Sequence, residues 1–193
     1  MLINDRGEVL GIQEKRGVTA GMKDFWKLPG GLVDPGEDLA KAAEVVEWSN
    51  QQYFLCNSMV CAHQREVMEE TGVKSKFVSI AAFRETHSGP FGSTDCYLIC
   101  CMQLDDSYGG EIPTPSPQEE EIANTDWIPL DKFLGSKFYA KGLYGSMLRT
   151  AAESALKVAT GEATGEQVGL AQSRMMGLGR KEEGMFHFGQ AKL

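Results

Sequence analysis

Residues 65–73, REVMEETGV, place three glutamates at a spacing that suits metal chemistry. On an α-helix, Glu66, Glu69 and Glu70 stand at positions i, i+3 and i+4, so their carboxylates project from one face within about one turn. Three like charges this close repel one another unless a cation lies among them. Because Mg²⁺ and Mn²⁺ prefer such oxygen ligands, the spacing favours a divalent metal site. A solvated acidic helix face is the alternative.

A glycine-rich loop, PGGLVDPGE at residues 29–37, stands upstream of this helix. Glycine has no Cβ, so the backbone at Gly31 can approach a ligand closely or offer its carbonyl to a metal. Arg65 can hold Glu37 in a bidentate pair and so fix the loop against the helix. Gly72 then ends the helix in the usual way. Loop, clamp and acidic helix together predict one site.

These residues resemble the Nudix box, whose pattern is G-x5-E-x7-R-E-U-x-E-E-x-G-U with U aliphatic. Gly31 and Glu37 match its first half, and residues 65–73 match its second half. The similarity extends over residues 2–130, through FWKLPGGLVDPGEDL, FRETHSGPFGSTDCYLICCMQL and the EEI…W element at residues 120–127. It is similar to the branch that includes the antisense basic fibroblast growth factor protein and the plant ADP-ribose and NADH pyrophosphatases.

The resemblance implies an α/β fold, the Nudix α/β/α sandwich with a mixed β-sheet. It implies hydrolysis of the pyrophosphate bond of a nucleoside diphosphate linked to a group X, with ADP-ribose or NADH preferred, and Mg²⁺ or Mn²⁺ as cofactor. The residues carried over as catalytic are Arg65, Glu66, Glu69, Glu70 and Glu120, the metal ligands are Gly31, Glu66, Glu69 and Glu70, and the structural clamp is Glu37 with Arg65.

Two further places are candidates for contacts with the substrate. Glu120 lies in an acidic loop with Glu119 and Glu121, and can supply a metal ligand or a general base. Arg84 and His87 can meet phosphate or ribose, and Phe91 can stack on a base. A solvated loop, for the glutamates, and ordinary loop packing, for His87 and Phe91, are the alternatives.

The box is interrupted. It requires seven residues between Glu37 and Arg65, whereas 27 stand there, and removing residues 45–64, VVEWSNQQYFLCNSMVCAHQ, restores the whole pattern. The segment either loops out so that the two halves re-form the site, or it prevents the site from forming. A specificity flap or dimer patch is one explanation. The preferred explanation is a retained intron of 60 nucleotides, because valine codons begin with GT and CAG is a glutamine codon.

Composition limits the partners. Lys plus Arg number 19 against 27 Asp plus Glu, so the net charge of −8 opposes binding to a nucleic-acid polymer or an anionic membrane. No apolar run reaches the ~20 residues of a membrane span, and the first residues, MLINDRGEVL, contain an acid and no apolar h-region. We therefore expect a soluble, cytoplasmic protein with a nucleoside diphosphate derivative as substrate. Many Nudix enzymes dimerise, so a homodimer stays an open alternative.

The chain reads as one Nudix domain over residues 1–160 and a flexible Gly- and Met-containing tail over 161–193. Strands are predicted at 8–15, 76–86, 96–104 and 125–130, a short strand around Trp26 and Leu28, and an amphipathic helix at 142–159. The resembling proteins carry a strand before LINDRGEVL, so we expect an N-terminal strand to be truncated. The five cysteines are expected to be small buried hydrophobes.

Three functions follow as hypotheses. The first is the pyrophosphohydrolase described above. The second is a Nudix-like binding protein, or splice variant, in which the insertion at residues 45–64 impairs catalysis. The third retains an enzyme but assigns it an oxidised nucleotide or an RNA cap as substrate. AMP release from ADP-ribose, by the chain and by the same chain without the insertion, separates the first two.

Overall fold

The computed structural model describes residues 1–17, 19–22, 24–32, 59–61, 64–87, 95–176 and 182–188. Its strands are β1 (Glu8–Glu14), β2 (Gly31–Leu32), β3 (Met59–Cys61), β4 (Ser75–Thr86), β5 (Asp95–Leu104), β6 (Ile122–Pro129), β7 (Leu170–Met176) and β8 (Glu182–Phe188). Its helices are α1 (Gln64–Thr71), α2 (Leu130–Leu134), α3 (Gly142–Ala159) and α4 (Gly165–Val168), with a short 3₁₀ turn, η2, at Asp106–Tyr108.

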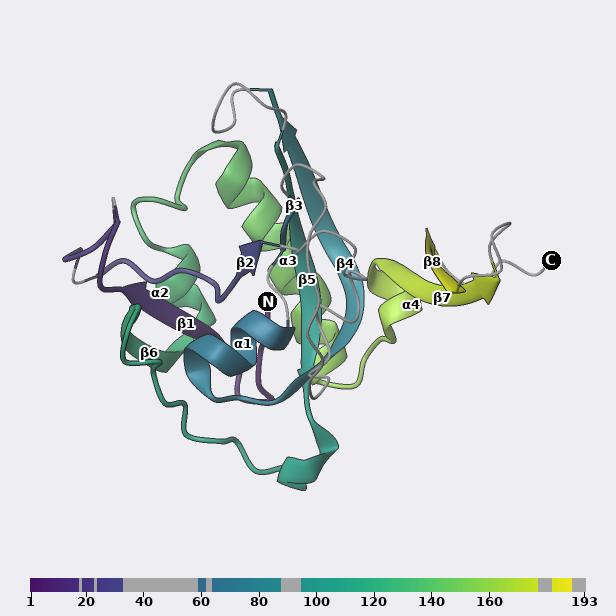
Figure 1. Ribbon diagram of the computed structural model, residues 1–193, viewed down its shortest axis with the longest axis horizontal. Helices are drawn as coiled ribbons and strands as arrows, with labels where there is room; N and C mark the ends of the chain where they lie inside the picture. The colour runs from purple at the N-terminus through teal and green to yellow at the C-terminus, as the bar shows by residue number, and fades with distance from the viewer. Residues whose placement is uncertain are drawn as a thin grey trace.

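Two sheets build the fold (Figure 1). The larger has the order β2-β3-β5-β4-β7-β8, and β1 pairs separately with β6. The β3–β5 pair is parallel, whereas β2–β3, β4–β5, β4–β7 and β7–β8 are antiparallel. The larger sheet is therefore mixed, as predicted.

Strand β5 is the centre of a sandwich. Successive residues of a strand point to opposite faces. Ile99 and Cys101 pack with the α3 residues Leu148 and Ala152 in one buried cluster. Leu98, Cys100 and Met102 belong to a second cluster that contains Val67 of α1. Helices α3 and α1 thus cover opposite faces of the sheet (Figure 1), which confirms the expected α/β/α layering.

Most predicted elements are found close to their expected places. Helix α3 spans residues 142–159 as predicted, and its buried residues fall on one face. Strands β1, β4 and β5 begin or end within one residue of the expected ranges. The short strand expected around Trp26 is reduced to a single bridge between Ile12 and Lys27. At the N-terminus, Leu2 bridges Met102 and Ile3 bridges Val9, with both side chains buried.

The described residues of the expected flexible tail over 161–193 form secondary structure, and its flexibility stays a prediction. Helix α4 opens with a capping box between Thr164 and Gln167, and β7 pairs with β8 over seven residues. The glycines that favoured disorder allow close packing instead: a Cβ at Gly165 would lie 2.6 Å from Cγ1 of Val78 in β4. The pair Ile80↔Leu170 joins β7 to β4, and the β7–β8 hairpin projects from one end of the molecule (Figure 1).

Part of the predicted insertion belongs to regular secondary structure. Its residues Met59–Cys61 form β3, which lies between β2 and β5 in the sheet. Its last residue, Gln64, begins α1. Residues 45–58, 62 and 63 lie outside the described part of the chain. Within the described ranges, no helix combines the length and apolar character that crossing a membrane requires.

Candidate active site

Helix α1 meets the glycine loop through Glu70. Its Oε2 accepts a hydrogen bond of 2.9 Å from the backbone N–H of Gly30, and only 9% of Glu70 is exposed. The helix ends directly afterwards, because Gly72 adopts the left-handed conformation with φ +68° and its N–H donates to the Met68 carbonyl. This termination, which the sequence predicts, holds Glu70 in the last turn of α1 against the loop.

Glu66 lies one turn earlier on the same face and contacts the next residue of the loop. A Cβ built on Gly31 would lie 2.3 Å from the carboxyl carbon of Glu66, far inside a van der Waals contact. Only glycine therefore leaves room for this carboxylate where it stands. Gly31 is itself anchored to the sheet, because β2 pairs with β3.

The electrostatics of Glu70 are those of a buried acid among other acids. The pKa of Glu70 is raised from its ordinary value of 4.5 to about 8, mainly by burial and in part by the nearby carboxylates of Glu66 and Glu14. The Gly30 N–H and the Lys27 ammonium oppose this rise. The ionised form of Glu70 is thus costly unless more positive charge arrives.

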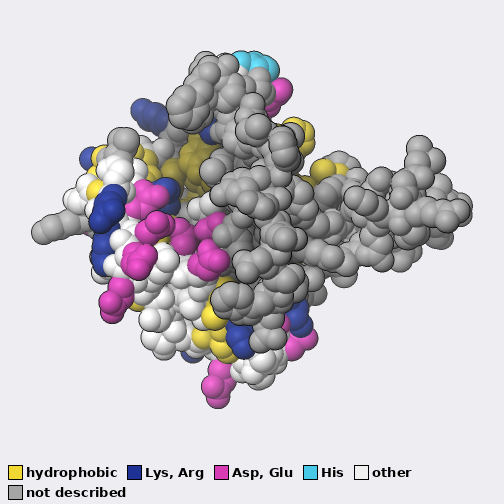
Figure 2. All heavy atoms as spheres, in the orientation of Figure 1, with side chains coloured by type: hydrophobic (Ala, Val, Ile, Leu, Met, Phe, Trp, Pro, Cys, Tyr) yellow, Lys and Arg dark blue, Asp and Glu magenta, His cyan; other side chains and the backbone are white. Residues whose placement is uncertain are grey.

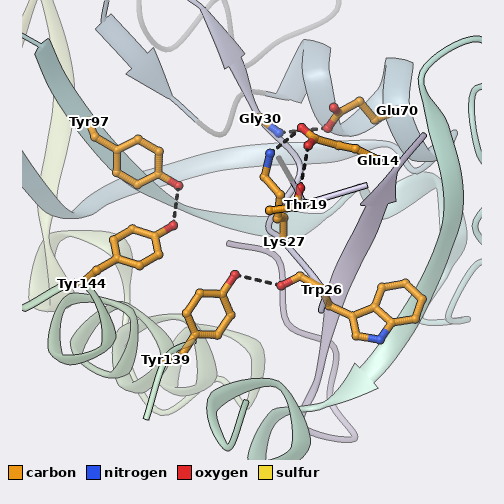
Figure 3. Close-up of polar contacts among 9 residues, drawn as sticks. All are labelled: Glu14, Thr19, Trp26, Lys27, Gly30, Glu70, Tyr97, Tyr139 and Tyr144. Carbon is orange, nitrogen blue, oxygen red and sulfur yellow. Dashed lines mark hydrogen bonds and ion pairs between the residues drawn. The ribbon is translucent and has the colours of Figure 1, made fainter. Parts of the chain in front are cut away.

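A third carboxylate, Glu14 at the end of β1, completes this acidic face. The Lys27 ammonium forms an ion pair with Glu14, and the Thr19 hydroxyl donates to the same carboxylate at 2.9 Å. Figure 3 shows Glu14 between Lys27 and Thr19, with Glu70 and Gly30 beside them. Figure 2 shows acidic side chains gathered on this face of the molecule. Sequence reasoning missed Glu14 and Lys27.

The donor set fits a hard divalent cation in part. Glu66 and Glu70 offer carboxylate oxygens beside a loop whose backbone can approach closely. Mg²⁺ is commonly held by one or two carboxylates, with water and substrate phosphates as its other ligands. In the residues that the structure describes, no three His, Cys, Asp or Glu side chains form a ready cluster. Glu69 is exposed on α1, so its role as a ligand stays a prediction.

The loop that carries Glu120 is tied to the same end of β1. The Lys15 ammonium donates to the carbonyl of Glu119, and the Lys15 N–H donates to the carbonyl of Glu121 at 2.8 Å. Lys15 follows Glu14, so these bonds bring the acidic loop next to the acidic face. Glu120 itself is exposed, and its catalytic role stays a prediction.

Arg84 lies over a group of tyrosines. Its guanidinium carbon is 5.7 Å from the ring centre of Tyr97 and 5.5 Å from that of Tyr144. Its Nε is buried and has no hydrogen-bond partner in the described part of the chain. The hydroxyls of Tyr97 and Tyr144 lie 3.2 Å apart, and burial raises the pKa of Tyr97. An unused donor at this place is suited to an anionic ligand.

Tyr139 links the tyrosine group to the active-site loop. Its hydroxyl donates to the Trp26 carbonyl at 2.8 Å, one residue before Lys27. Figure 3 shows the hydroxyls of Tyr97 and Tyr144 directed toward each other and that of Tyr139 directed toward the Trp26 carbonyl. No spacing rule identifies these tyrosines, because they come from β5, the α2–α3 connection and α3.

Some predicted residues cannot be placed against the site. Glu37 and Phe91 lie outside the described residues, and only the backbone of Arg65 is described, within α1. The clamp between Glu37 and Arg65 and the stacking role of Phe91 therefore stay predictions. His87 is exposed, with its Nε2 3.9 Å from Glu85.

The fold and the site define a class: an α/β sandwich in which a glycine loop meets a helix rich in glutamate. Residues 59–149 match the family model described as the NUDIX domain. The chain therefore carries a domain of the Nudix family. The matched region begins at β3 and includes α1, whereas the glycine loop precedes it.

Relatives and a solved structure agree. Nudix hydrolase 2 of Arabidopsis thaliana is 34% identical over 137 residues, which are 71% of this chain and 40% of that protein. The human nucleoside diphosphate-linked moiety X motif 6 is 38% identical over 112 residues, covering 57% and 27%. The chain thus spans less than half the length of these relatives. A NUDIX hydrolase from Nitrosomonas europaea shares the fold, with a TM-score of 0.50 at 16% identity, covering 77% of this chain and 82% of that one.

Proposed function

We propose that this chain hydrolyses the pyrophosphate bond of a nucleoside diphosphate linked to X, with Mg²⁺ or Mn²⁺ as cofactor and ADP-ribose or NADH as preferred substrates. The observation that carries the proposal is the contact of the buried Glu70 carboxylate with the glycine loop at Gly30, beside Glu66. The Nudix domain supplies the reaction class. Relatives named for a nucleoside diphosphate-linked moiety X support the substrate class.

Glu66 and Glu70 are the residues that would hold the cation, with the Gly31 carbonyl as a further ligand. A divalent cation held there would supply neutralisation of the pyrophosphate charge and a water activated for attack on phosphorus. Glu70 is buried, and its pKa is raised to about 8 because the charged form is poorly solvated there. A bound cation would stabilise that charged form. Lys27 and Thr19 hold Glu14 in position, so the neighbouring carboxylate is fixed rather than free to rotate.

The part of the substrate that lies away from the metal also carries phosphate and ribose, which need a binding group on the other side of the glycine loop. Arg84 is suited to it, because its Nε has no partner among the described residues and its charge lies on two tyrosine rings. Tyr139 joins this group to Trp26, so the two parts flank one loop. We assign phosphate or ribose of the substrate to Arg84.

The test is AMP release from ADP-ribose and from NADH by the intact chain, with Mg²⁺, with Mn²⁺ and with EDTA. We expect release that requires the metal and is lost in Glu66→Gln. The same assay on the chain without residues 45–64 separates the enzyme from a binding protein. Activity in the deletion alone would show that the insertion impairs this chain, and no metal-dependent hydrolysis in either would overturn the proposal.

A further inference from the structure

A separate cavity of about 420 Å³ opens beside the active-site loop. It is lined by Met22, Asp24, Phe25, Ser136, Lys137 and Phe138. Its walls come from two segments far apart in the sequence, the loop before Trp26 and the connection between α2 and α3. Both segments lie on the α2 side of the molecule in Figure 1.

The two walls are fixed to each other. The rings of Phe25 and Phe138 are in edge contact, with centres 4.5 Å apart. Tyr139, the next residue, packs on Phe25 at 5.5 Å and donates its hydroxyl hydrogen to the Trp26 carbonyl. Tyr139 is buried, so these contacts join the two walls inside the fold.

The lining combines three polar with three apolar side chains, and two of the apolar ones are exposed. Among the residues that the structure describes, four large hydrophobic side chains are exposed, and two of them, Met22 and Phe138, line this cavity at 37% and 42% exposure. Single exposed hydrophobic residues need no explanation, but two on one aromatic-walled cavity favour a ligand. A flat aromatic ring bound in the cavity would cover the exposed side chains of Met22 and Phe138.

The polar groups match the rest of a nucleotide. Lys137 is exposed, and its ammonium lies 5.2 Å from the centre of the Phe138 ring. Such an exposed cation–π contact is weak enough to be exchanged for a phosphate. Asp24 and Ser136 add hydrogen-bonding groups that can read the polar edge of a base.

The cavity lies within reach of the acidic face. Phe25 precedes Lys27 by two residues and Gly30 by five, and five residues span at most about 18 Å. The Gln13 side chain donates to the Phe25 carbonyl, and Gln13 adjoins Glu14. A ligand in the cavity therefore sits at the edge of the loop that meets Glu66 and Glu70.

We propose that this cavity binds the nucleobase of the substrate, which packs against the edge-to-face pair of Phe25 and Phe138 rings while Lys137 meets the attached phosphate. The inference rests on the proposed function for the identity of the substrate, but it concerns a different set of residues. It also differs from the stacking role predicted for Phe91.

The test compares binding of AMP with binding of ribose 5-phosphate, which lacks the base, by calorimetry on the intact chain with Mg²⁺. The variants are Phe138→Ala and Phe138→Leu, which keeps an apolar side chain without the ring. The control is Leu143→Ala, which removes a side chain that is 77% exposed and outside the cavity. We expect both Phe138 variants to weaken AMP binding about tenfold and to leave ribose 5-phosphate binding unchanged.

Two results would overturn the inference. One is equal affinity of the parent chain for AMP and ribose 5-phosphate, and the other is unchanged AMP affinity in both Phe138 variants. Hydrolysis of ADP-ribose is measured beside binding. If AMP binding depends on Phe138 but ADP-ribose is not hydrolysed, the cavity binds the base and the proposed function is wrong. If Phe138→Ala hydrolyses ADP-ribose with an unchanged KM, the proposed function stands and the cavity does not bind the nucleobase.

Discussion

The Gly30 N–H and the Glu70 carboxylate are joined by a hydrogen bond of 2.9 Å although 40 residues separate them in the chain. The two halves of the box therefore meet despite the 27 residues between Glu37 and Arg65. A backbone N–H on a glycine-rich loop is the donor, so the loop must approach the helix closely. Burial of Glu70 at this contact is the property from which the first two predictions follow.

Glu70→Gln is expected to lower metal-dependent AMP release about 100-fold, because the amide cannot supply the negative charge that a divalent cation needs. The amide oxygen can still accept from Gly30, so the melting temperature at pH 7 should stay the same or rise. Glu153→Gln, on the exposed face of α3, is the matched control. Full activity in Glu70→Gln would contradict the assignment of Glu70.

Stability without metal should depend on pH through Glu70. Its pKa is raised from 4.5 to about 8, so between these values the native state keeps a proton that the unfolded chain has released. The free energy of unfolding therefore falls as pH rises from about 4.5 to 8, by up to ~1.4 kcal/mol for each unit. Urea unfolding in EDTA from pH 5 to 9 measures this slope. The slope should be smaller in Glu70→Gln, and equal slopes would refute the raised pKa.

The parts of the site that the sequence predicts are those with local spacing. Glu66 and Glu70 share a helix, and Gly72 ends it, so pattern alone places them on one face of α1. Glu14 and Lys27 are brought to this face by the β1–β6 sheet and a bridge to Ile12, which involve distant residues. No local pattern encodes such contacts, which is why both residues were missed.

The same distinction applies to the fold. Helix α3 has a clear apolar repeat, and its bounds could be predicted. The sequence of α4 and β7 is rich in glycine and polar residues, which is typical of loops, yet Gly165 and Gly169 are needed where the backbone lies against β4. Strand β3 was missed because its neighbours in the sheet, β2 and β5, are far away in the chain.

Gly31→Ala is expected to weaken Mn²⁺ binding about 10- to 100-fold with little loss of stability. The new Cβ would lie 2.3 Å from the Glu66 carboxyl carbon, which is the far end of a flexible side chain and can move at a cost of about 1 kcal/mol. Glu66→Asp shortens that side chain. In the double variant, the losses of Mn²⁺ affinity caused by Gly31→Ala and by Glu66→Asp should be less than additive. Calorimetric Mn²⁺ titration checks both variants. Unchanged affinity in Gly31→Ala would show that Glu66 is misassigned.

Arg84→Met is expected to raise KM for ADP-ribose about tenfold and to leave the melting temperature unchanged or higher. Methionine retains the packing on Tyr97 and Tyr144 but removes a charge that is partly buried and whose Nε has no partner among the described residues. Lys132→Met, an exposed change on α2, is the control. If KM stays constant while only stability changes, Arg84 serves packing and does not meet the substrate.

Gly165→Ala tests whether α4 is packed on the sheet as an integral part of the domain. The added methyl would lie 2.6 Å from Cγ1 of Val78 and 2.7 Å from its carbonyl oxygen, so backbone must move and the free energy of unfolding should fall by about 1–3 kcal/mol. Glu166→Ala changes the exposed neighbour and should be nearly neutral. Urea unfolding measures the difference. A neutral Gly165→Ala would mean that α4 leaves the sheet easily, in line with the flexible tail expected from the sequence, because a loosely held segment accommodates an extra methyl without cost.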